Sequence, residues 1–388
     1  MPETPSSAYV HIPFCVRKCR YCDFPSYAGR EDCVGEYTEA VCSEIRHAAD
    51  VLSRDHALKP LRTVFFGGGT PTLAGADRLV RILRTLRDTF SLEEGTEATL
   101  EANPGTVTPD GFARLRAGGF NRVSLGLQAV QPHLLRTLGR IHSAEDFFDA
   151  VRAARSAGFE NIGADIMLGL PGQTPEDLRE TLARVIGAGV DHVSFYSLQV
   201  EEGTPFFELQ SAGRLDLPEE DAERAMYHET RRTLESAGLP PYEISNAARP
   251  GRECRHNLVY WRAEEYLGFG CAAHSYVGGT RRANTADLDA YVAAMGRGHS
   301  DGAFPAAREL ETVGREGQMK EYMMLGFRLS AGPDAEGFFR RFGERAETRF
   351  AAELADLDNR GFIERTGTGW RLTVRGLDMA NQVFMAFV

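Results

Sequence analysis

Short apolar, β-branched runs alternate with longer amphipathic runs through the first half of the chain. The apolar runs predict strands over residues 8–13, 63–66, 97–101, 122–127, 161–168 and 192–198. The amphipathic runs between them predict helices near residues 36–52, 78–90, 109–117, 144–157 and 175–187. Repeated βα units imply a parallel sheet with right-handed crossovers. The first half therefore predicts an α/β fold, an open and partial (β/α)6 barrel.

The pattern changes beyond residue 200. Helical patterns are found at residues 219–237, 319–326, 335–342, 346–359 and 376–387, and residues 361–373 fit a hairpin. Helices followed by a two-stranded wing predict a small, winged-helix-like α+β domain. We therefore expect three parts, namely a barrel over residues 1–235, a connecting segment over residues 236–312 and a C-terminal domain over residues 313–388.

Polar residues and glycines gather at the C-terminal ends of the predicted strands, where βα barrels build their active sites. After the stretch that follows the first strand, they are Gly67, Gly68, Gly69, Thr70, Glu101, Asn103, Gln128, Asp165 and Gln199. Any one of them could be a helix cap or a turn former, but a series of this kind favours a site. Asp165 lies inside its predicted strand, so its orientation toward the interior is an assumption.

The stretch after the first strand contains the most specific chemical signal, a C-x3-C-x2-C motif formed by Cys15, Cys19 and Cys22. Thiolates are soft ligands that suit zinc or iron–sulfur clusters. No fourth cysteine lies nearby, so a 4Fe–4S cluster held here would keep one iron open to another ligand. A structural zinc site or a chance group of buried thiols is the alternative.

Charge and composition exclude several classes of protein. The chain of 388 residues has 44 basic and 55 acidic residues, a formal net charge of −11, which argues against a nucleic-acid-binding surface. The segment before the first predicted strand is short and polar, unlike a signal peptide, and no apolar run is long enough for a membrane span. The seven cysteines favour reduced thiols over a disulfide framework. We therefore expect a cytoplasmic protein.

The motif and its surroundings, Tyr9-x-His11-Ile-Pro-Phe-Cys15, resemble the radical S-adenosylmethionine (SAM) superfamily. Within it they are similar to the branch of the oxygen-independent coproporphyrinogen III oxidases and the HemW family of haem chaperones. The resemblance implies that the three cysteines of the motif hold a 4Fe–4S cluster and that SAM chelates its open iron. It also implies SAM-site roles for Tyr9, Tyr21, Gly67, Gly68, Gly69, Thr70, Glu101, Gln128, Arg140 and Asp165.

These residue types suit SAM. The carboxylates of Glu101 and Asp165 can accept hydrogen bonds from its amino group and ribose hydroxyls, and the Arg140 guanidinium can pair with its carboxylate. Consecutive glycines at residues 67–69 allow backbone to approach a ligand closely, although a glycine run alone is more often a tight turn.

Two features separate the relatives within this branch. The oxidases have a fourth cysteine two residues after the third, where this chain has Phe24. The segment containing His256, Asn257, Tyr260 and Trp261 resembles the H-N-x-x-Y-W signature of the haem chaperones. Both features favour a haem chaperone over an oxidase.

The residues of this signature suit haem. Histidine is the commonest proximal haem ligand and tyrosine an alternative, and in a helix His256 and Tyr260 would share a face. On chemistry alone, His256 could instead cap a helix while Tyr260 and Trp261 fill a core. His274 is a second candidate ligand, with Cys254 and Cys271 ranking third.

We therefore expect a haem chaperone that transfers haem to apo-haemoproteins, such as respiratory enzymes, and that has no assigned catalytic residue. The resemblance also implies a bacterioferritin-like haem donor and a homodimer. Three alternatives remain at this point: a coproporphyrinogen III oxidase, a radical SAM methyltransferase that degrades haem, and a structural zinc protein.

Overall fold

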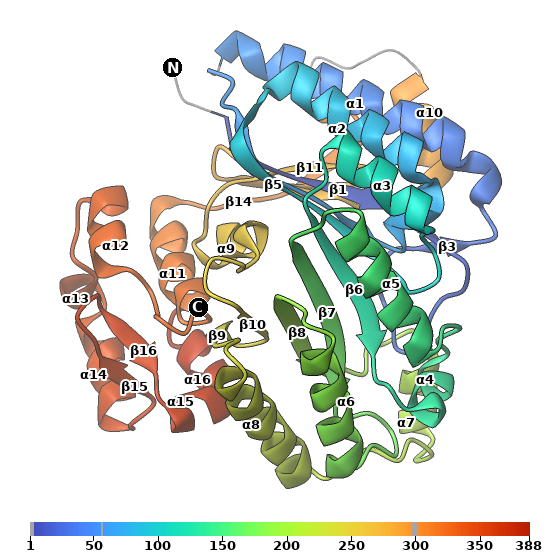
Figure 1. Cartoon of the computed structure of the whole chain (residues 1–388). Coiled ribbons are helices and arrows are strands. Elements are labelled where there is room, and N and C mark those ends of the chain that lie inside the picture. The colour runs from blue at the N-terminus through green and yellow to red at the C-terminus, as the bar shows by residue number, and fades with distance from the viewer. Residues whose placement is uncertain (1–3, 56, 297–301) are drawn as a thin grey trace.

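The computed structural model describes residues 4–55, 57–296 and 302–388. Its centre is a curved nine-stranded sheet in the order β11-β1-β4-β5-β6-β7-β8-β10-β9 (Figure 1). The strands from β11 to β8 are parallel, whereas β10 and β9 continue the sheet in the antiparallel sense. The six predicted strands are therefore confirmed, and three further strands extend the two edges of the sheet.

The strands of the large sheet are β1 (Ser7–Ile12), β4 (Leu61–Gly68), β5 (Leu92–Ala102), β6 (Arg122–Gln128), β7 (Asn161–Leu168), β8 (His192–Ser197), β9 (Pro241–Glu243), β10 (Asn246–Ala248) and β11 (Leu267–Phe269). The smaller sheets contain β2 (Phe14–Cys15), β3 (Tyr27–Ala28), β12 (His274–Val277), β13 (Thr280–Asn284), β14 (Ala307–Thr312), β15 (Ile363–Arg365) and β16 (Trp370–Leu372).

Helices cover the outer face of the sheet, as the βα pattern predicts. The longer ones are α1 (Val34–Asp55), α2 (Ala76–Phe90), α3 (Pro109–Gly118), α5 (Ala144–Ser156), α6 (Pro175–Gly187), α8 (Glu220–Ser236) and α10 (Leu288–Gly296). Shorter helices are η1 (Glu31–Cys33), η2 (Pro71–Ala74), α4 (Pro132–Leu138) and α7 (Pro205–Ser211), whereas α9 (Arg255–Trp261) packs against β4 from inside the barrel. Capping boxes at Ser143 and Thr174 fix where α5 and α6 begin.

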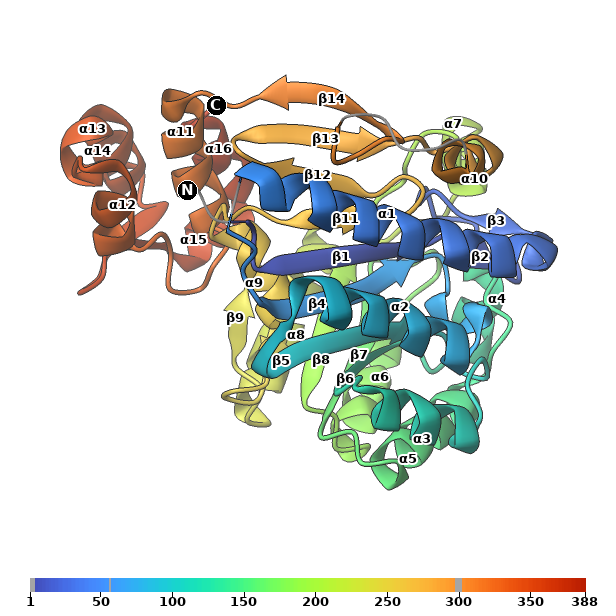
Figure 2. The same ribbon diagram turned by 90° about the horizontal axis from the view of Figure 1, so that it is seen from above.

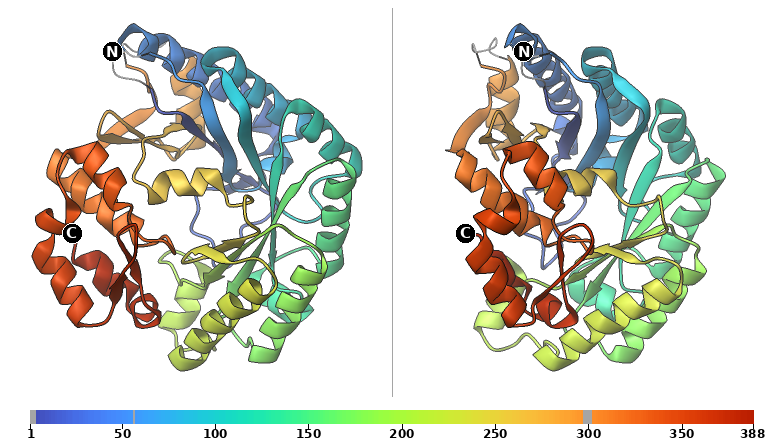
Figure 3. Two further views of the ribbon diagram at one scale, coloured as in Figure 1. Left: turned by 60° about the vertical axis from the view of Figure 1, so that its left-hand side comes forward. Right: turned by 90° about the vertical axis from the view of Figure 1, so that its left-hand side faces the viewer.

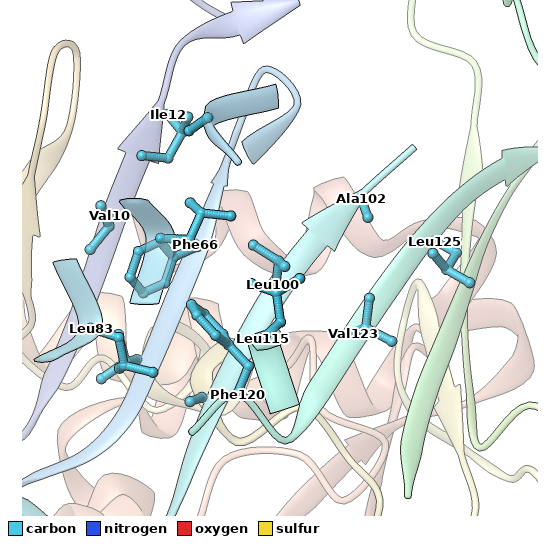
Figure 4. Close-up of a cluster of buried hydrophobic side chains, with 14 of the residues drawn as sticks. Val10, Ile12, Phe66, Leu83, Leu100, Ala102, Leu115, Phe120, Val123 and Leu125 are labelled. Atoms are coloured by element: carbon cyan, nitrogen blue, oxygen red, sulfur yellow. The ribbon is translucent and has the colours of Figure 1, made fainter. Parts of the chain in front are cut away.

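The apolar core lies between the sheet and these helices, outside the barrel. The side chains labelled in Figure 4 are Val10, Ile12, Phe66, Leu83, Leu100, Ala102, Leu115, Phe120, Val123 and Leu125. Successive residues of a strand point to opposite faces, so Tyr9, Glu101, Ser124 and Asp165 face the interior. Fully burying one such apolar side chain contributes about 1.5–3 kcal/mol. The outer core thus supports the fold and leaves polar groups inside.

The C-terminal domain has an apolar cluster of its own. It contains α11 (Arg315–Gly326), α12 (Ala335–Phe342), α13 (Ala346–Arg349), α14 (Ala351–Asn359), α15 (Val374–Asp378) and α16 (Ala380–Met385), with β15 and β16 as the predicted wing. The single helix expected over residues 376–387 is wrong, because the backbone at Met379 leaves the helical region and separates α15 from α16. Figure 2 shows this domain at one end of the barrel and β2 and β3 at the other.

The segment that we expected to be a connection is built into the barrel. It supplies β9 and β10 to one edge of the sheet and β11 to the other, and it forms all three strands of the β12–β14 sheet. The described residues contain no helix long and apolar enough to cross a membrane.

Candidate functional site

The three cysteines of the motif lie at the C-terminal end of the barrel, in the chain between β1 and β3. All three are partly exposed free thiols. Sγ of Cys15 is 3.7 Å from Oγ1 of Thr70, and Nη1 of Arg140 donates to Sγ of Cys19 over 3.5 Å. The N–H of Cys22 donates to the carbonyl of Cys19 over 3.3 Å, which makes the second half of the motif a turn. The motif is thus held against the ends of β4 and β6.

The arrangement of the thiols bears on what they could hold. Among the described residues, no three His, Cys, Asp or Glu side chains are grouped tightly enough for one metal ion. The thiolates of a four-iron cluster each bind a different iron, so they stand farther apart than the ligands of one ion. Burial, with the neighbouring Cys19 adding to it, raises the pKa of the Cys22 thiol to about 11. Bound iron would offset this, because metal binding favours the thiolate.

Arg140 links the cysteines to the barrel interior. Its Nη2 donates to Oδ1 of Asn103 over 2.6 Å and to the carbonyl of Gly126 over 2.5 Å. Its Nε is buried and has no hydrogen-bond partner in the part of the chain that the structure describes. A buried donor without a partner costs about 1–3 kcal/mol. A ligand carboxylate would remove that cost, and the predicted pairing with SAM therefore fits this position.

The glycine run brings the end of β4 close to the cysteines. A Cβ atom at Gly69 would lie 2.6 Å from the carbonyl oxygen of Phe14, and one at Gly67 would lie 3.0 Å from Oε2 of Glu101. The N–H groups of Gly69 and Thr70 donate to the carbonyls of Ile12 and Phe14 over 2.9 and 2.7 Å. These two amides are therefore occupied by the chain itself. The glycines are needed for packing whether or not a ligand binds there.

Two carboxyl groups share the barrel interior. Burial, together with the charge of Asp165, raises the pKa of Glu101 to about 8. Burial also raises the pKa of Asp165, although hydrogen bonds from Ser194 and Ser124 oppose the shift. Oγ of Ser124 is 3.0 Å from Oδ1 of Asp165, so Asp165 faces the interior, as we assumed. Both carboxyls are poised to accept a cation, because a positive ligand would favour their ionised forms.

The other residues of the predicted SAM site lie around this interior. The Tyr9 hydroxyl is 3.0 Å from Nδ1 of His11. Tyr21 packs against an apolar cluster that includes Leu138. Gln128 has a φ of 70°, a strained value for a residue that is not glycine. Strain of this kind concentrates at functional sites, and here it lies where β6 ends.

The H-N-x-x-Y-W segment lies at the opposite end of the barrel, as helix α9, which crosses the interior (Figure 3). His256 is 1% exposed and stacks on Phe65 at 5.3 Å. Its Nδ1 is 2.9 Å from Oγ1 of Thr63, and its Nε2 is 2.9 Å from the hydroxyl of Tyr260. Neither ring nitrogen is open to a haem iron in this geometry. The alternative that we drew from chemistry alone, a buried histidine among core aromatics, describes it.

The remaining residues of this segment tie the barrel to the C-terminal domain. The guanidinium of Arg328 stacks on the Trp261 ring at 4.2 Å, and Arg341 donates to the carbonyl of Ala263 over 2.8 Å. Asn257 is partly buried on the same helix. This end of the barrel is thus closed by packing between α9 and the C-terminal domain.

The lower-ranked haem ligands divide between the two ends. Cys254 is fully buried near Glu97, at the closed end. Cys271 is also fully buried, and its Sγ lies 3.2 Å from the carbonyl oxygen of Ala286. His274 is exposed, and it begins β12 close to His11, whose pKa is lowered by burial and also by His274.

Sequence reasoning gave no role to several residues of the site. Asn103 bonds both Arg140 and Thr70, His11 bonds Tyr9, and Tyr196 is 43% exposed inside the barrel. The sequence pattern placed Asn103 in the series at the strand ends, after Glu101, but did not indicate what it bonds. Strand alternation also puts His11 on the same face as Tyr9.

Comparison with known proteins agrees with this geometry. Residues 9–185 match the pattern of the radical SAM superfamily, and residues 314–379 match the HemN C-terminal domain. The crystallised coproporphyrinogen III oxidase HemN of Escherichia coli superposes with a TM-score of 0.83 at 25% identity, over 100% of this chain and 91% of that chain. This protein is therefore a radical SAM fold protein with a HemN-type C-terminal domain.

Relatives that are similar over nearly the full length show more closely which family the chain belongs to. The chain is 37% identical to the haem chaperone HemW of Bacillus subtilis over 98% of this chain and 99% of that protein. It is 32% identical to HemW of Escherichia coli over 99% of this chain and 98% of that protein. The chain belongs to the HemW family.

Proposed function

We propose that this protein binds haem and transfers it to apo-haemoproteins, and that it carries a 4Fe–4S cluster and SAM at the open end of its barrel. The similarity to haem chaperones over nearly the whole chain supports the cargo. Within this proposal the protein acts in the cytoplasm, respiratory enzymes are the acceptors, a bacterioferritin-like protein is a donor, and the working unit is a homodimer.

The observation that carries the proposal is Phe24. It stands where the oxidases have a fourth cysteine, and its side chain is 61% exposed beside the cluster motif. A phenyl ring has no thiol hydrogen and no lone pair to give. Val16 and Ile141 are also exposed, at 52% and 63%, and they border a cavity together with Cys19 and Arg140. An apolar rim of this kind suits a flat macrocycle better than it suits water.

In this proposal Cys15, Cys19 and Cys22 hold the cluster. When bound, a 4Fe–4S cluster supplies an iron that is open to a further ligand and a source of single electrons. Arg140 holds the carboxylate of SAM through its unpartnered Nε. Glu101 and Asp165 accept hydrogen bonds from the rest of SAM inside the barrel.

One other function has a specific observation in its favour. The barrel superposes over its whole length on that of a coproporphyrinogen III oxidase, so the fold would accommodate oxidase chemistry. Phe24 argues against that activity. The haem-degrading methyltransferase and the structural zinc protein predict different products and colours, so the same experiment separates them.

The test uses the full chain reconstituted anaerobically with iron and sulfide. Haem is titrated and followed by absorption, and parallel samples receive coproporphyrinogen III, SAM and reductant. The proposal predicts a brown protein that binds haem stoichiometrically and forms no protoporphyrinogen. Turnover of the porphyrinogen without specific haem uptake would identify an oxidase, release of iron from haem a degrading enzyme, and a colourless zinc protein a structural role.

A further inference from the structure

His274 presents an imidazole at the open end of the barrel that is free for a ligand. His274 is exposed and makes no side-chain hydrogen bond within the described ranges 4–55, 57–296 and 302–388. In contrast, His11 bonds Tyr9 and the carbonyl of Pro25, and His142 bonds the carbonyl of Leu127. His256 is buried with both ring nitrogens bonded. A ligand that needs an open imidazole would therefore meet His274 without any rearrangement of the core.

The turn that presents His274 is held rigidly. Glu44, a fully buried carboxylate on α1, accepts hydrogen bonds from the N–H of Gly270 over 2.8 Å, from Asn284 over 2.7 Å and from Tyr291 over 2.6 Å. Ala272 within the turn has a φ of 61°, which is strained for alanine. Burying a carboxylate and straining a backbone both cost free energy. Such costs are typical of a turn that must hold a side chain in one place.

The surroundings of His274 suit a flat, anionic macrocycle. His274 pairs with Ala283 and Ala283 with Arg308 across β12, β13 and β14, so His274 and Arg308 share a face of this sheet. Two strand spacings separate them, about 10 Å. Arg308 forms no ion pair with a carboxylate of the described residues. The iron of haem lies at its centre and its propionates lie at one edge, so one haem could bind both residues.

The loop that contains Phe24 lies against the same turn. The carbonyl of Pro25 bonds Nε2 of His11, the Tyr27 hydroxyl donates to the carbonyl of Ala286, and Arg30 pairs with Asp289 at 2.6 Å. These contacts bring the cysteine-containing loop beside the segment that follows β13. The exposed Phe24 ring is thus available at the same end of the barrel as His274.

We infer that His274 is the haem-iron ligand of this protein, with Arg308 holding a propionate, and that His256 is a positioning residue that never meets the iron. The inference rests on the proposed haem-binding function. A neutral imidazole binds iron, and partial burial with the charge of Arg308 lowers the pKa of His274, which keeps it neutral.

Haem titrations of the reconstituted full chain test the assignment. His274→Ala should weaken haem binding at least tenfold and shift the Soret band, while the cluster absorption stays unchanged. His274→Cys should restore binding with the spectrum of a thiolate-bound haem. Arg308→Gln should weaken binding severalfold without changing the Soret band, because it removes only a charge contact. His133→Ala removes an exposed imidazole from α4 that pairs with Asp177 of α6, and it should change nothing.

The possible failures are distinguishable. If the His274 variants bind haem with the wild-type affinity and spectrum, the inference is wrong while the proposed function stands. The assignment of His274 would be contradicted most strongly if the His256→Gln variant, checked for folding by circular dichroism, lost the wild-type haem spectrum. If the wild-type protein itself takes up no haem, both the assignment and the proposed function fail.

Discussion

The two ends of the barrel differ in how their candidate ligand-binding groups are bonded. At the closed end, both nitrogens of His256 are bonded, and α9 is held by the C-terminal domain. At the open end, Arg140 has a buried Nε without a partner among the described residues, and the charge of Asp165 helps to raise the pKa of the buried Glu101. The closed end also has buried donors without a partner among the described residues, Nε1 of Trp261 and Nε of Arg328, so the contrast is between His256 and Arg140. Arg140 loses free energy unless a ligand bonds its Nε.

Because of this difference, the residues that identify the family are not the residues that we assign to the ligand site. The H-N-x-x-Y-W segment resembles the signature of the haem chaperones, yet both ring nitrogens of its His256 are already bonded. The partly exposed thiols of the cysteine motif and the unpartnered Nε of Arg140 lie at the other end. In the proposed function, the signature therefore marks the family through the packing of His256, while the ligands bind at the open end.

The largest effect is expected at the cysteines. Cys19→Ser should abolish the cluster, because two thiolates cannot hold a cubane that needs at least three protein ligands here. Iron and sulfide content and the charge-transfer absorption measure this. Cys33→Ser is the matched control, a partly exposed cysteine outside the motif that bonds Arg30, and it should leave the cluster intact. Equal loss in both variants would contradict the ligand assignment.

The closed end should respond in stability rather than in ligand binding. His256→Ala removes two buried hydrogen bonds and a stacked ring, so we expect a loss of about 2–4 kcal/mol in the free energy of unfolding. Chemical denaturation measures this. His274→Ala should change stability by less than about 0.5 kcal/mol, because its side chain is exposed. A His256 variant as stable as wild type would show that the closed end is not a core.

Because of His256, we also expect the free energy of unfolding to depend on pH. Burial, with the charge of Arg122 adding to it, lowers the pKa of His256 to about 3 from 6.5. Below pH 6.5 the unfolded chain takes up a proton on this histidine, whereas the folded chain does not do so until the pH approaches 3. The stability that the buried, neutral His256 contributes is therefore fully present above pH 6.5 and is lost as pH falls toward 3. The destabilisation caused by His256→Gln should therefore shrink in acid. A constant difference would contradict the sign.

A smaller effect is expected at the open end from Arg140. Arg140→Gln removes a charged partner of the SAM carboxylate, a loss of about 1.5–3 kcal/mol or at least tenfold in SAM affinity. Equilibrium dialysis with the reconstituted protein measures this. Arg136→Gln, an exposed arginine on α4, is the matched control and should bind SAM normally. Unchanged affinity in the Arg140 variant would remove it from the site.

The smallest effect concerns one proton. Because the pKa of Glu101 is about 8, its carboxyl is mostly protonated at pH 7 in the free protein. A bound sulfonium cation favours the ionised form, so SAM binding should release close to one proton at pH 7. Calorimetry in buffers of different ionisation enthalpy counts it, and Glu101→Gln should abolish the release. Proton uptake on binding would contradict the account.

Local sequence patterns predict the central strands of the barrel well, but they do not predict the strands that complete its edges. The apolar runs along the chain were enough to predict β1, β4, β5, β6, β7 and β8, and the cysteine spacing was enough to suggest the proposed cluster ligands. Strand β11 has three residues and pairs with β1, more than 250 positions earlier, so no local pattern announces it. The burial of His256 depends in the same way on Thr63 and Phe65, which are distant in sequence. Tertiary packing therefore determines that His256 is buried, which the motif alone did not reveal.

Transfer of haem is the central claim, and one measurement tests it most directly. The haem-loaded, reconstituted protein is mixed with an excess of apomyoglobin, and the Soret band is followed over time. The account predicts that haem moves to apomyoglobin faster from this protein than from an equal amount of haem-loaded serum albumin. It also predicts that free haem does not accumulate. Haem that stays on the protein, or that is consumed with loss of the porphyrin band, would contradict the role of a carrier.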